Sequence, residues 1–405
     1  MINKQRTYFL ISILILGSCG LLKKSTGIKK DEQSVKYANT ITSEELKKHL
    51  SIIASDEYEG RETGRKGQRM TAEYLKKEFI TYGVKPGNNG DYFQYFDLVE
   101  TNAPIAGIKV NGESYSYLKD FYFFQSYSDF SNFTISKSSI YPISKGIVEG
   151  ERDDYGSKNY NGKTLIISID KEEGFDSWNW RKKLKLAKDK GAERVFFTSS
   201  NFESNIERLS HFLEGSSMKL KTKEKKNLEN IPFFFISNKL EKEILKENVD
   251  NNKIEFAIIS QNEEITSTNV LGFIEGTDPE LKKEIIVITA HYDHLGIKDG
   301  LVYNGADDDG TGTVALLEIA EAFQKAKNEG NGVKRSILIM PVSGEEKGLL
   351  GSSYYSDNPI YPTANTVVDL NIDMIGRLDE NHKKPDYVYL IGADKISKEL
   401  HDISE

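Results

Sequence analysis

The sequence predicts an α/β fold, with a mostly parallel sheet flanked by helices and a smaller β-rich α/β domain inserted into the chain. Two observations carry this prediction. After Thr266, buried strand runs alternate with an amphipathic helix, which is typical of a parallel sheet. Between about residues 106 and 265 the apolar runs are shorter and stand between charged loops. With 38% hydrophobic and 29% charged residues, the 405-residue chain does not have the composition of a polytopic membrane protein or a disordered chain.

The first residues have the features of an export signal rather than of a folded domain. Residues 1–18 begin with a basic stretch and continue with the apolar run Tyr8 to Gly17, which is too short to span a bilayer comfortably. Cys19 follows in "LGSC" and is the only cysteine of the chain. This segment resembles the lipobox of bacterial lipoproteins, whose lipidated cysteine would anchor the chain to a membrane without spanning it. An ordinary secretory signal with an incidental cysteine is the alternative.

The N-terminal features predict where the protein acts and which partners it lacks. Residues 19–36 are expected to be a flexible tether, and the predicted location is the bacterial cell envelope, with the lipid-anchored chain periplasmic or associated with the outer membrane. A single cysteine excludes an intrachain disulfide and a Cys-rich zinc module. The net charge of −8 lacks the basic footprint of a nucleic-acid-binding protein, so we predict no nucleic-acid partner.

Residues 37–105 are expected to form the N-terminal part of the main domain. The segment "TSEELKKHLSIIAS" predicts a helix, because Thr42 and Glu45 have the spacing of a capping box and leucine and isoleucine recur at helical intervals. A Gly/Arg-rich loop, "YEGRETGRKG", follows. A second predicted helix then ends at Gly83.

Residues 106–265 are expected to form the inserted domain. Three apolar runs predict strands in "GKTLIISID", "ERVFFT" and "IPFFFIS". A helix is expected between the first two, where Trp180, Leu184 and Ala187 share one face.

Residues 266–405 are expected to hold the catalytic domain. Four buried runs predict strands: "EIIVITA", "RSILIMPV", "TVVDLNIDM" and "DYVYLIG". The segment "TVALLEIAEAF" predicts the helix between the first two, with its apolar residues on one face.

Metal-type ligands follow the ends of three of these strands and precede the helix. Ligands of open α/β sheets bind outside the carboxyl ends of the strands, so these side chains are expected to converge. Several carboxylates held close together need a cation, and histidine with carboxylates but without thiolates suits zinc. Two metal ions that share a carboxylate would use the acidic excess and could activate water. The candidates are His291, Asp293, Asp307, Asp308, Asp309, Glu345, Glu346 and Asp373.

Two local spacings suggest a division of roles. Consecutive side chains of an extended segment point apart, so one of Glu345 and Glu346 can bind metal while the other acts as general base. His291 and Asp293 share a face of a strand, so the carboxylate of Asp293 could accept the second N–H of the imidazole.

The ordered motifs resemble the co-catalytic zinc aminopeptidases of peptidase family M28. The similar residues are "HYD", "GADDDGTG", "EE" and "DM", together with the "GRETGRKG" loop, and the resemblance covers about residues 40–100 and 266–405. The inserted domain resembles the protease-associated domain of that family, with less specific motifs.

The resemblance implies a zinc aminopeptidase-like fold, two zinc ions and a role for each site residue. His291 and Asp373 would hold one zinc ion, Asp308 would bridge both, and Glu346 would hold the other. Glu345 would be the general base and Asp293 would orient His291.

The sequence departs from the family pattern at its last metal ligand. The family takes that ligand from a histidine far beyond the "DM" motif, whereas this chain offers only His382 and His401 there. We therefore expect the sequence to be C-terminally incomplete and its second zinc site to be weak. For His294, in "AHYDHLG", the expected role is a hydrogen bond within its loop.

The predicted function is hydrolysis of peptide bonds, with removal of N-terminal residues from a peptide or protein substrate. One alternative is a glutaminyl cyclase, which has a related fold, a single zinc ion and no hydrolytic step. A second alternative is an inert lipoprotein that binds a substrate or partner. The two-metal motifs favour the peptidase over the cyclase.

Overall fold

The computed structural model describes residues 31–125, 130–221, 231–246 and 253–404. Its contacts divide the chain into two units, Ile41–Arg377 and the two terminal segments Met1–Thr40 and Leu378–Glu405. The predicted signal peptide (1–18), the lipidation site Cys19 and most of the predicted tether lie outside the described residues. Within the described ranges, no helix has both the length and the apolar run that crossing a membrane requires.

A five-stranded sheet forms the centre of the larger unit, in the order β1-β14-β18-β15-β19. β15 runs parallel to both β18 and β19, whereas β14 and β1 are antiparallel additions. This arrangement confirms the predicted α/β class with parallel strands at the predicted positions. The strands are β1 (Lys85–Pro86), β14 (Gly272–Ile274), β15 (Ile285–His291), β18 (Ser336–Val342) and β19 (Thr366–Asn371).

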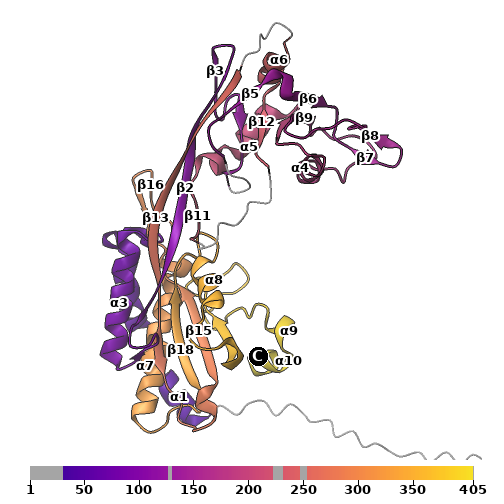
Figure 1. Cartoon of the computed structure of the whole chain (residues 1–405). Coiled ribbons are helices and arrows are strands. Elements are labelled where there is room, and N and C mark those ends of the chain that lie inside the picture. Colours follow the sequence, from indigo (N-terminus) through magenta and orange to yellow (C-terminus); the bar gives the residue numbers. More distant parts are fainter. Residues whose placement is uncertain (1–30, 126–129, 222–230, 247–252, 405) are drawn as a thin grey trace, which may run out of the picture. The chain divides into compact units, whose positions relative to one another are not determined.

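Apolar side chains cover both faces of this sheet, because successive strand residues point to opposite sides. On one face Ile337 and Ile339 pack with Leu316 of the central helix α7. On the other face Leu338 and Met340 pack with Tyr355 of α8. The helices of this part are α2 (Ser43–Ile53), α3 (Lys66–Tyr82), α7 (Gly312–Asn328) and α8 (Leu350–Asp357) (Figure 1).

Local signals set the ends of the two N-terminal helices as predicted. The backbone N–H of Glu45 donates to the Thr42 hydroxyl at 3.2 Å, which caps α2. α3 ends at Gly83, whose φ of 79° is the left-handed conformation that glycine adopts at low cost. Between these helices the Gly/Arg-rich loop forms a short 3-10 helix, η1 (Asp56–Arg61).

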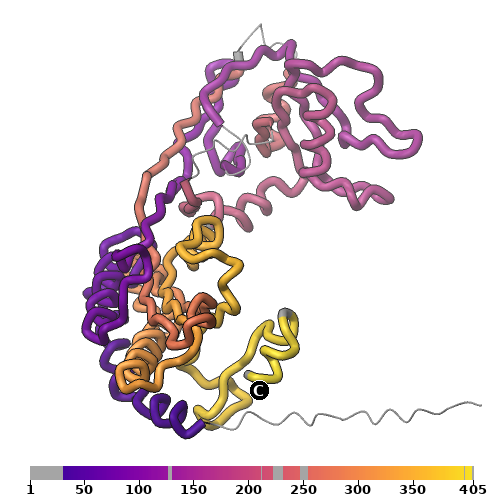
Figure 2. The backbone as a smooth tube through the Cα atoms, turned by 60° about the horizontal axis from the view of Figure 1, so that its bottom comes forward, coloured from indigo at the N-terminus to yellow at the C-terminus, as the bar shows by residue number. Residues whose placement is uncertain are grey.

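Two 18-residue strands, β2 (Phe93–Val110) and β13 (Lys253–Val270), connect this part to the inserted region. They pair antiparallel along almost their whole lengths, with one irregularity at Ile259/Gln261 (Figures 1 and 2). The predicted domain limits at 105/106 and 265/266 therefore fall inside continuous strands, and the domain division itself stays a prediction. Three shorter strands join the same sheet: β3 (Glu113–Ser116), β5 (Phe133–Ser136) and β11 (Ser217–Leu220).

A third five-stranded sheet lies in the inserted region, in the order β4-β12-β10-β9-β6. Its strands are parallel except for β4, and its core is rich in phenylalanine, including Phe196, Phe197 and Phe234. The strands are β4 (Phe121–Tyr122), β6 (Ile140–Ile143), β9 (Thr164–Ser168), β10 (Arg194–Thr198) and β12 (Phe233–Ile236). Its helices are α4 (Trp180–Asp189), α5 (Phe202–Glu214) and α6 (Asn238–Leu245).

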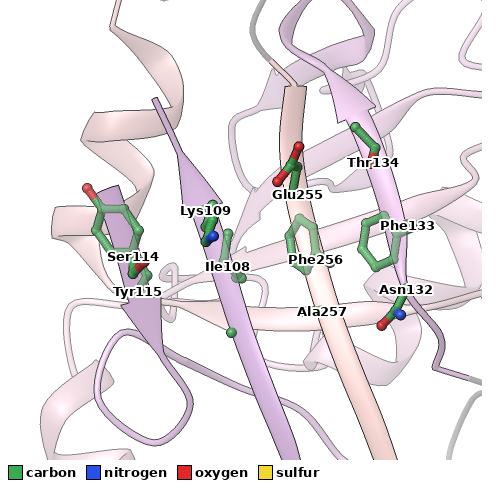
Figure 3. A pocket seen from close by; sticks show the side chains of 11 residues that line it. Ile108, Lys109, Ser114, Tyr115, Asn132, Phe133, Thr134, Glu255, Phe256 and Ala257 are labelled. Atoms are coloured by element: carbon green, nitrogen blue, oxygen red, sulfur yellow. The ribbon is translucent and has the colours of Figure 1, made fainter. Parts of the chain in front are cut away.

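Two small hairpins and a hollow also belong to the larger unit. The hairpins are β7 (Val148–Glu149) with β8 (Arg152–Asp153), and β16 (Gly296–Lys298) with β17 (Leu301–Tyr303). A hollow of about 430 Å³ lies over β2, β3, β5 and β13 (Figure 3). Lys109 and Glu255 line it from paired strands, and none of the predicted site residues does.

The smaller unit contains short helices and no strand among its described residues. The helices are α1 (Glu32–Ala38), α9 (Ala393–Ile396) and α10 (Lys398–Ser404). The strand expected in "DYVYLIG" (386–392) is therefore wrong for this structure. A strand needs a partner that pairs with its backbone, and here Val388 and Ile391 are 66% and 92% exposed.

Candidate metal centre

The candidate site lies in the larger unit, where β15, β18 and β19 end. β15 ends at His291, whose backbone carbonyl accepts a hydrogen bond from the Thr313 hydroxyl at 2.8 Å. His291 pairs with Val342 at the end of β18, and Thr289 pairs with Asn371 at the end of β19. The three strand ends are thus side by side, and the loops beyond them carry Glu345, Glu346 and Asp373.

His291 lies at the centre of the first group of possible metal ligands. Its Nε2 atom is 3.1 Å from Oδ1 of Asp308 and 3.9 Å from Oδ1 of Asp373. One ligand atom from each of these three residues lies within 4.8 Å of the others. His291 is buried whereas Asp373 is exposed, so this group has one solvent-facing side.

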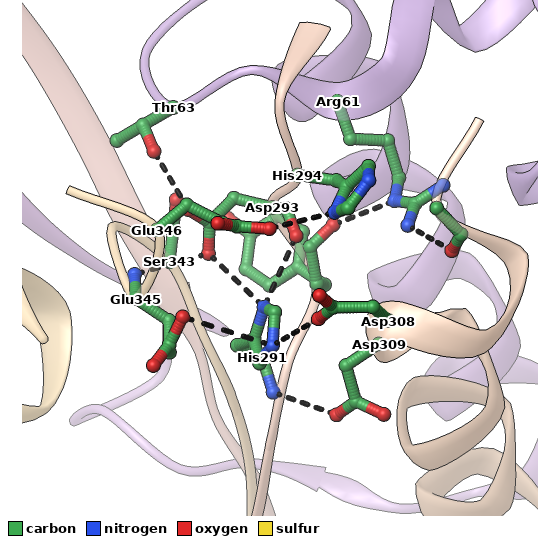
Figure 4. A network of polar contacts seen from close by, with 12 residues as sticks. Arg61, Thr63, His291, Asp293, His294, Asp308, Asp309, Ser343, Glu345 and Glu346 are labelled. Atoms are coloured by element: carbon green, nitrogen blue, oxygen red, sulfur yellow. Dashed lines mark hydrogen bonds and ion pairs between the residues drawn. The ribbon is translucent and has the colours of Figure 1, made fainter. Parts of the chain in front are cut away.

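His294 forms a second group with Asp308 and Glu346. Its Nδ1 atom is 2.7 Å from Oε1 of Glu346 (Figure 4), but the pair lacks hydrogen-bond alignment. Both atoms are buried, and neither has a hydrogen-bond partner among the described residues. From the sequence, a hydrogen bond within its own loop is expected for His294, and this placement differs from it. Two buried metal-ligating atoms that lie this close together, without an aligned hydrogen bond between them, suit a shared cation.

Asp308 belongs to both groups, so the two possible metal sites share one carboxylate. It lies in the irregular turn η5 (Ala306–Thr311), which leads into α7. The combined set contains two imidazoles and three carboxylates and no thiolate, which is a donor set that suits two zinc ions. The residues present therefore fit a two-metal centre with a bridging carboxylate.

Glu345 lies next to this set rather than within it. Its Oε2 atom is 3.9 Å from Nε2 of His291, and its side chain is 34% exposed. A carboxylate that is close to the ligands and open to solvent can reach a water molecule beside the metal ions. This is the position that the predicted general base requires.

Asp293 is held rigidly behind His291. Its carboxylate accepts hydrogen bonds from the Thr63 hydroxyl at 2.7 Å and from the backbone N–H of Glu345 at 3.2 Å. The hydrogen-bond contact to Nδ1 of His291 comes from the backbone carbonyl of Asp293 at 3.1 Å, whereas its carboxylate Oδ1 is 3.8 Å away. Asp293 thus contacts the ring mainly through its main chain, unlike the carboxylate contact that the sequence suggests.

Electrostatics indicate that the cluster carries more carboxylates than its own cations balance. Burial raises the pKa of Glu345 and Asp373, and it raises the pKa of Asp309 to about 7. Burial alone would lower the pKa of His291, but the carboxylates around it, Asp293 first, outweigh this effect and raise it. Contact with His294 holds the pKa of Glu346 below its usual value. A bound divalent cation would favour the ionised carboxylates throughout.

The structure also assigns positions to residues for which the sequence offered little. Asp309 is fully buried and accepts the backbone N–H groups of His291, Gly312 and Met374, so it holds the ligand segments together. Thr63 and Arg61, in the Gly/Arg-rich loop, contact the segment of Asp293 from 230 residues earlier in the chain. The "GRETGR" pattern marked this loop, but no spacing rule connects it to the later motifs.

Comparison with known families identifies the segment that carries the ligands. Residues 269–402 match the family model described as Peptidase family M28. This segment is M28-like. This M28-like segment includes both candidate metal groups and Glu345, and Arg61 and Thr63 precede it.

Curated relatives also match part of the chain. A "Probable zinc metalloprotease" of Pyrenophora tritici-repentis is 34% identical over 127 residues, which are 30% of this chain and 25% of that protein. "Aminopeptidase YwaD" of Bacillus subtilis is 31% identical over 112 residues, 27% of this chain and 22% of that protein. The matches thus span about a quarter of the length of these relatives.

Solved aminopeptidases are also similar to the chain. The match to an aminopeptidase from Aneurinibacillus sp. strain AM-1 covers 84% of this chain and 72% of that protein's chain, with 17% identity and a TM-score of 0.45.

Proposed function

We propose that the protein is a zinc metallopeptidase that removes N-terminal residues from peptides. The observation that carries this proposal is the pair of ligand groups that share Asp308, with the carboxylate of Glu345 beside them. The M28-like segment and the names of the curated relatives, a zinc metalloprotease and an aminopeptidase, support the same reaction class.

In this proposal each ligand group holds one zinc ion. His291 and Asp373 hold the first, His294 and Glu346 hold the second, and Asp308 contacts both. When bound, the zinc pair supplies Lewis acidity that activates a water molecule and polarises the substrate carbonyl.

Glu345 performs the proton transfers of the reaction. Its carboxylate accepts a proton from the attacking water, whose oxygen bonds to the carbonyl carbon of the scissile peptide. The C–N bond then breaks, and Glu345 returns the proton to the departing amine. Asp293 keeps His291 and the backbone of Glu345 in place during these steps, because it contacts both.

A substrate panel tests this proposal. The zinc-loaded chain is expected to hydrolyse aminoacyl p-nitroanilides with a free α-amino group, to lose this activity to a chelator, and to regain it with zinc. Matched N-acetylated substrates show whether the free amine is required. Absence of turnover on every peptide by a zinc-loaded chain would contradict the proposal. Ammonia release from N-terminal glutamine without hydrolysis would indicate the cyclase instead, and peptide binding without turnover the inert binding protein.

We also propose that a lipid on Cys19 anchors the enzyme in the bacterial cell envelope. The lipobox-like "LGSC" after an apolar run supports this proposal. In cells fed a clickable fatty acid, the full chain is expected to be labelled and to sediment with membranes, and the Cys19→Ser variant is expected to lose the label. Labelling that survives this substitution would contradict the anchor.

A further inference from the structure

Arg61 is a completely buried arginine at the end of η1, and its guanidinium binds backbone carbonyls rather than a carboxylate. Nε donates to the carbonyl of Tyr292 at 2.8 Å, and Nη2 donates to that of Gly305 at 2.7 Å. Nη1 donates to the carbonyls of Asn304 at 2.6 Å and Ile53 at 2.9 Å. One side chain therefore connects three separate segments of the chain.

Two of these segments carry the candidate metal ligands. Tyr292 stands between His291 and Asp293, and Gly305 precedes Asp308 by three residues. The main chain of Arg61 adds a further contact, because its carbonyl accepts the backbone N–H of His294 at 3.2 Å. Arg61 thus fixes the backbone beside both histidines and beside the shared carboxylate.

The charge of Arg61 faces the same cluster. A buried cation surrounded by neutral acceptors is costly unless negative charge lies near it. Burial lowers the pKa of Arg61 to about 10, while Asp293, Asp309 and Asp308 act in the opposite direction. Even so, the guanidinium stays protonated at neutral pH and offsets part of the carboxylate charge when no metal is bound.

The backbone that carries this side chain is strained. Glu59, Gly60 and Arg61 have φ values of 50°, 63° and 54°, and the left-handed conformation is unfavourable for the two non-glycine residues. At Gly60 only glycine fits, because a Cβ atom would lie 2.4 Å from the carbonyl oxygen of Tyr303. Strain of this kind persists where the surrounding contacts hold the residue in place.

We propose that Arg61 is the positioning residue of the metal centre. Its guanidinium holds the backbone at Tyr292 and at Asn304–Gly305. In this way it places His291, His294 and Asp308 at the two metal positions. This inference rests on the proposed two-metal centre.

Metal affinity in substituted chains tests the inference. Arg61→Lys keeps the positive charge but cannot reach all four carbonyls. Arg61→Met loses the charge and the hydrogen bonds to all four carbonyls. We expect the dissociation constant for zinc, measured against a competing chelator, to rise at least about tenfold for Arg61→Lys and more for Arg61→Met, as for other residues that support metal ligands. The visible spectrum of the cobalt-substituted Arg61 variants should also differ from that of the cobalt-substituted wild type.

Two controls separate positioning from general stability. Arg69→Met removes a comparable bond to a backbone carbonyl, that of Gly64 at 2.6 Å. Phe79→Leu destabilises the buried core of α3. Both are expected to leave zinc affinity unchanged. Folded Arg61 variants that bind zinc within twofold of the wild type would overturn the inference while leaving the metallopeptidase proposal intact. A wild-type chain that binds no metal would contradict both.

If the Arg61 variants do not fold, the wild type itself supplies the measurement. In arginine-labelled protein, zinc binding is expected to shift the Nε–H resonance of Arg61 and slow its exchange, with Arg69 unaffected. An Arg61 resonance that does not respond to zinc would contradict the inference.

Discussion

The ends of β9 and β10 differ from the ends of β15, β18 and β19 in how their polar side chains are hydrogen-bonded. At β9 and β10 these side chains form hydrogen bonds with one another, whereas at β15, β18 and β19 some polar atoms have no hydrogen-bond partner among the described residues. In the inserted region Asp170 accepts hydrogen bonds from the hydroxyls of Ser199 and Ser200 and from the Ser200 backbone. In the candidate metal centre Nδ1 of His294 and Oε1 of Glu346 are buried without a hydrogen-bond partner in the described structure.

The comparison shows what parallel topology does and does not provide. In both sheets parallel strands bring distant residues to one edge. Whether that edge holds a metal ion depends on residue type and on the donor atoms left unpaired. Asp170 is part of a hydrogen-bond set with two serines, while Asp308 belongs to two groups of possible metal ligands.

Removing the shared carboxylate should have the largest effect. We expect Asp308→Ala to lower zinc content from two ions to fewer than one per chain and to abolish peptidase activity, because both ligand groups use this residue. Asp170→Ala, at the equivalent edge of the other sheet, should keep both ions. Elemental analysis of the two variants measures this difference. Equal zinc loss in Asp308→Ala and Asp170→Ala would contradict the claim that only the sheet edge with Asp308 binds metal.

Replacing the neighbouring glutamate should separate chemistry from metal binding. Glu345→Gln is expected to reduce kcat by about 10²–10⁴-fold, the usual contribution of a general base, with zinc content unchanged. Glu207→Gln, on the exposed surface of α5 in the inserted region, is the matched control. A Glu345→Gln chain that loses zinc would show instead that Glu345 is a ligand.

His294 should matter for one ion only. We expect His294→Ala to retain the ion held by His291 and Asp373 and to lose the other, so that zinc falls to about one per chain. His382→Ala is the control, because His382 contacts Asp379 at 2.8 Å and stacks on Tyr387 within its own unit. If His382→Ala loses zinc and His294→Ala keeps both ions, the second zinc ion is held by His382 in the C-terminal segment and not by His294.

The smallest effect concerns the buried lysine of the inserted region. Lys183 is 1% exposed and donates to the Ser168 carbonyl at 2.8 Å, and burial lowers its pKa to about 8. Between pH 8 and 10 the unfolded chain binds this proton more tightly than the folded chain. The contribution of Lys183 to the free energy of unfolding should therefore rise with pH there, by on the order of 1 kcal/mol per unit of pKa difference.

Urea unfolding of the wild type and its variants at pH 8 and pH 10 measures this contribution. Between these pH values the free energy of unfolding should change less favourably in Lys183→Met than in the wild type, whereas in Lys185→Met, with its side chain 77% exposed on the same helix, it should change as in the wild type. Identical pH dependence in wild type and Lys183→Met would show that this buried amine is not charged differently in the two states.

Much of the fold and of the ligand set could be predicted from local patterns. Apolar runs located β15, β18 and β19, and the motifs at their ends named the residues that the structure brings together, His291, Asp308 and Asp373 among them. The role of His294 could not be predicted, because its approach to Glu346 depends on how two loops after different strands fold back. The contacts of Arg61 were also beyond the sequence, since its acceptors are backbone carbonyls, which leave no residue-type signal. In the segment "DYVYLIG" the sequence pattern predicts a strand that the structure does not have. An apolar run forms a strand only where another strand pairs with its backbone.

The number of zinc ions per chain tests the central claim most directly. The purified wild-type chain from Gly20 to Glu405, loaded with zinc and freed of excess metal, can be measured by elemental analysis against protein concentration. Two ligand groups that share Asp308 predict two zinc ions per chain. One ion or none would contradict the account, because the group of His294, Asp308 and Glu346 would then not bind metal.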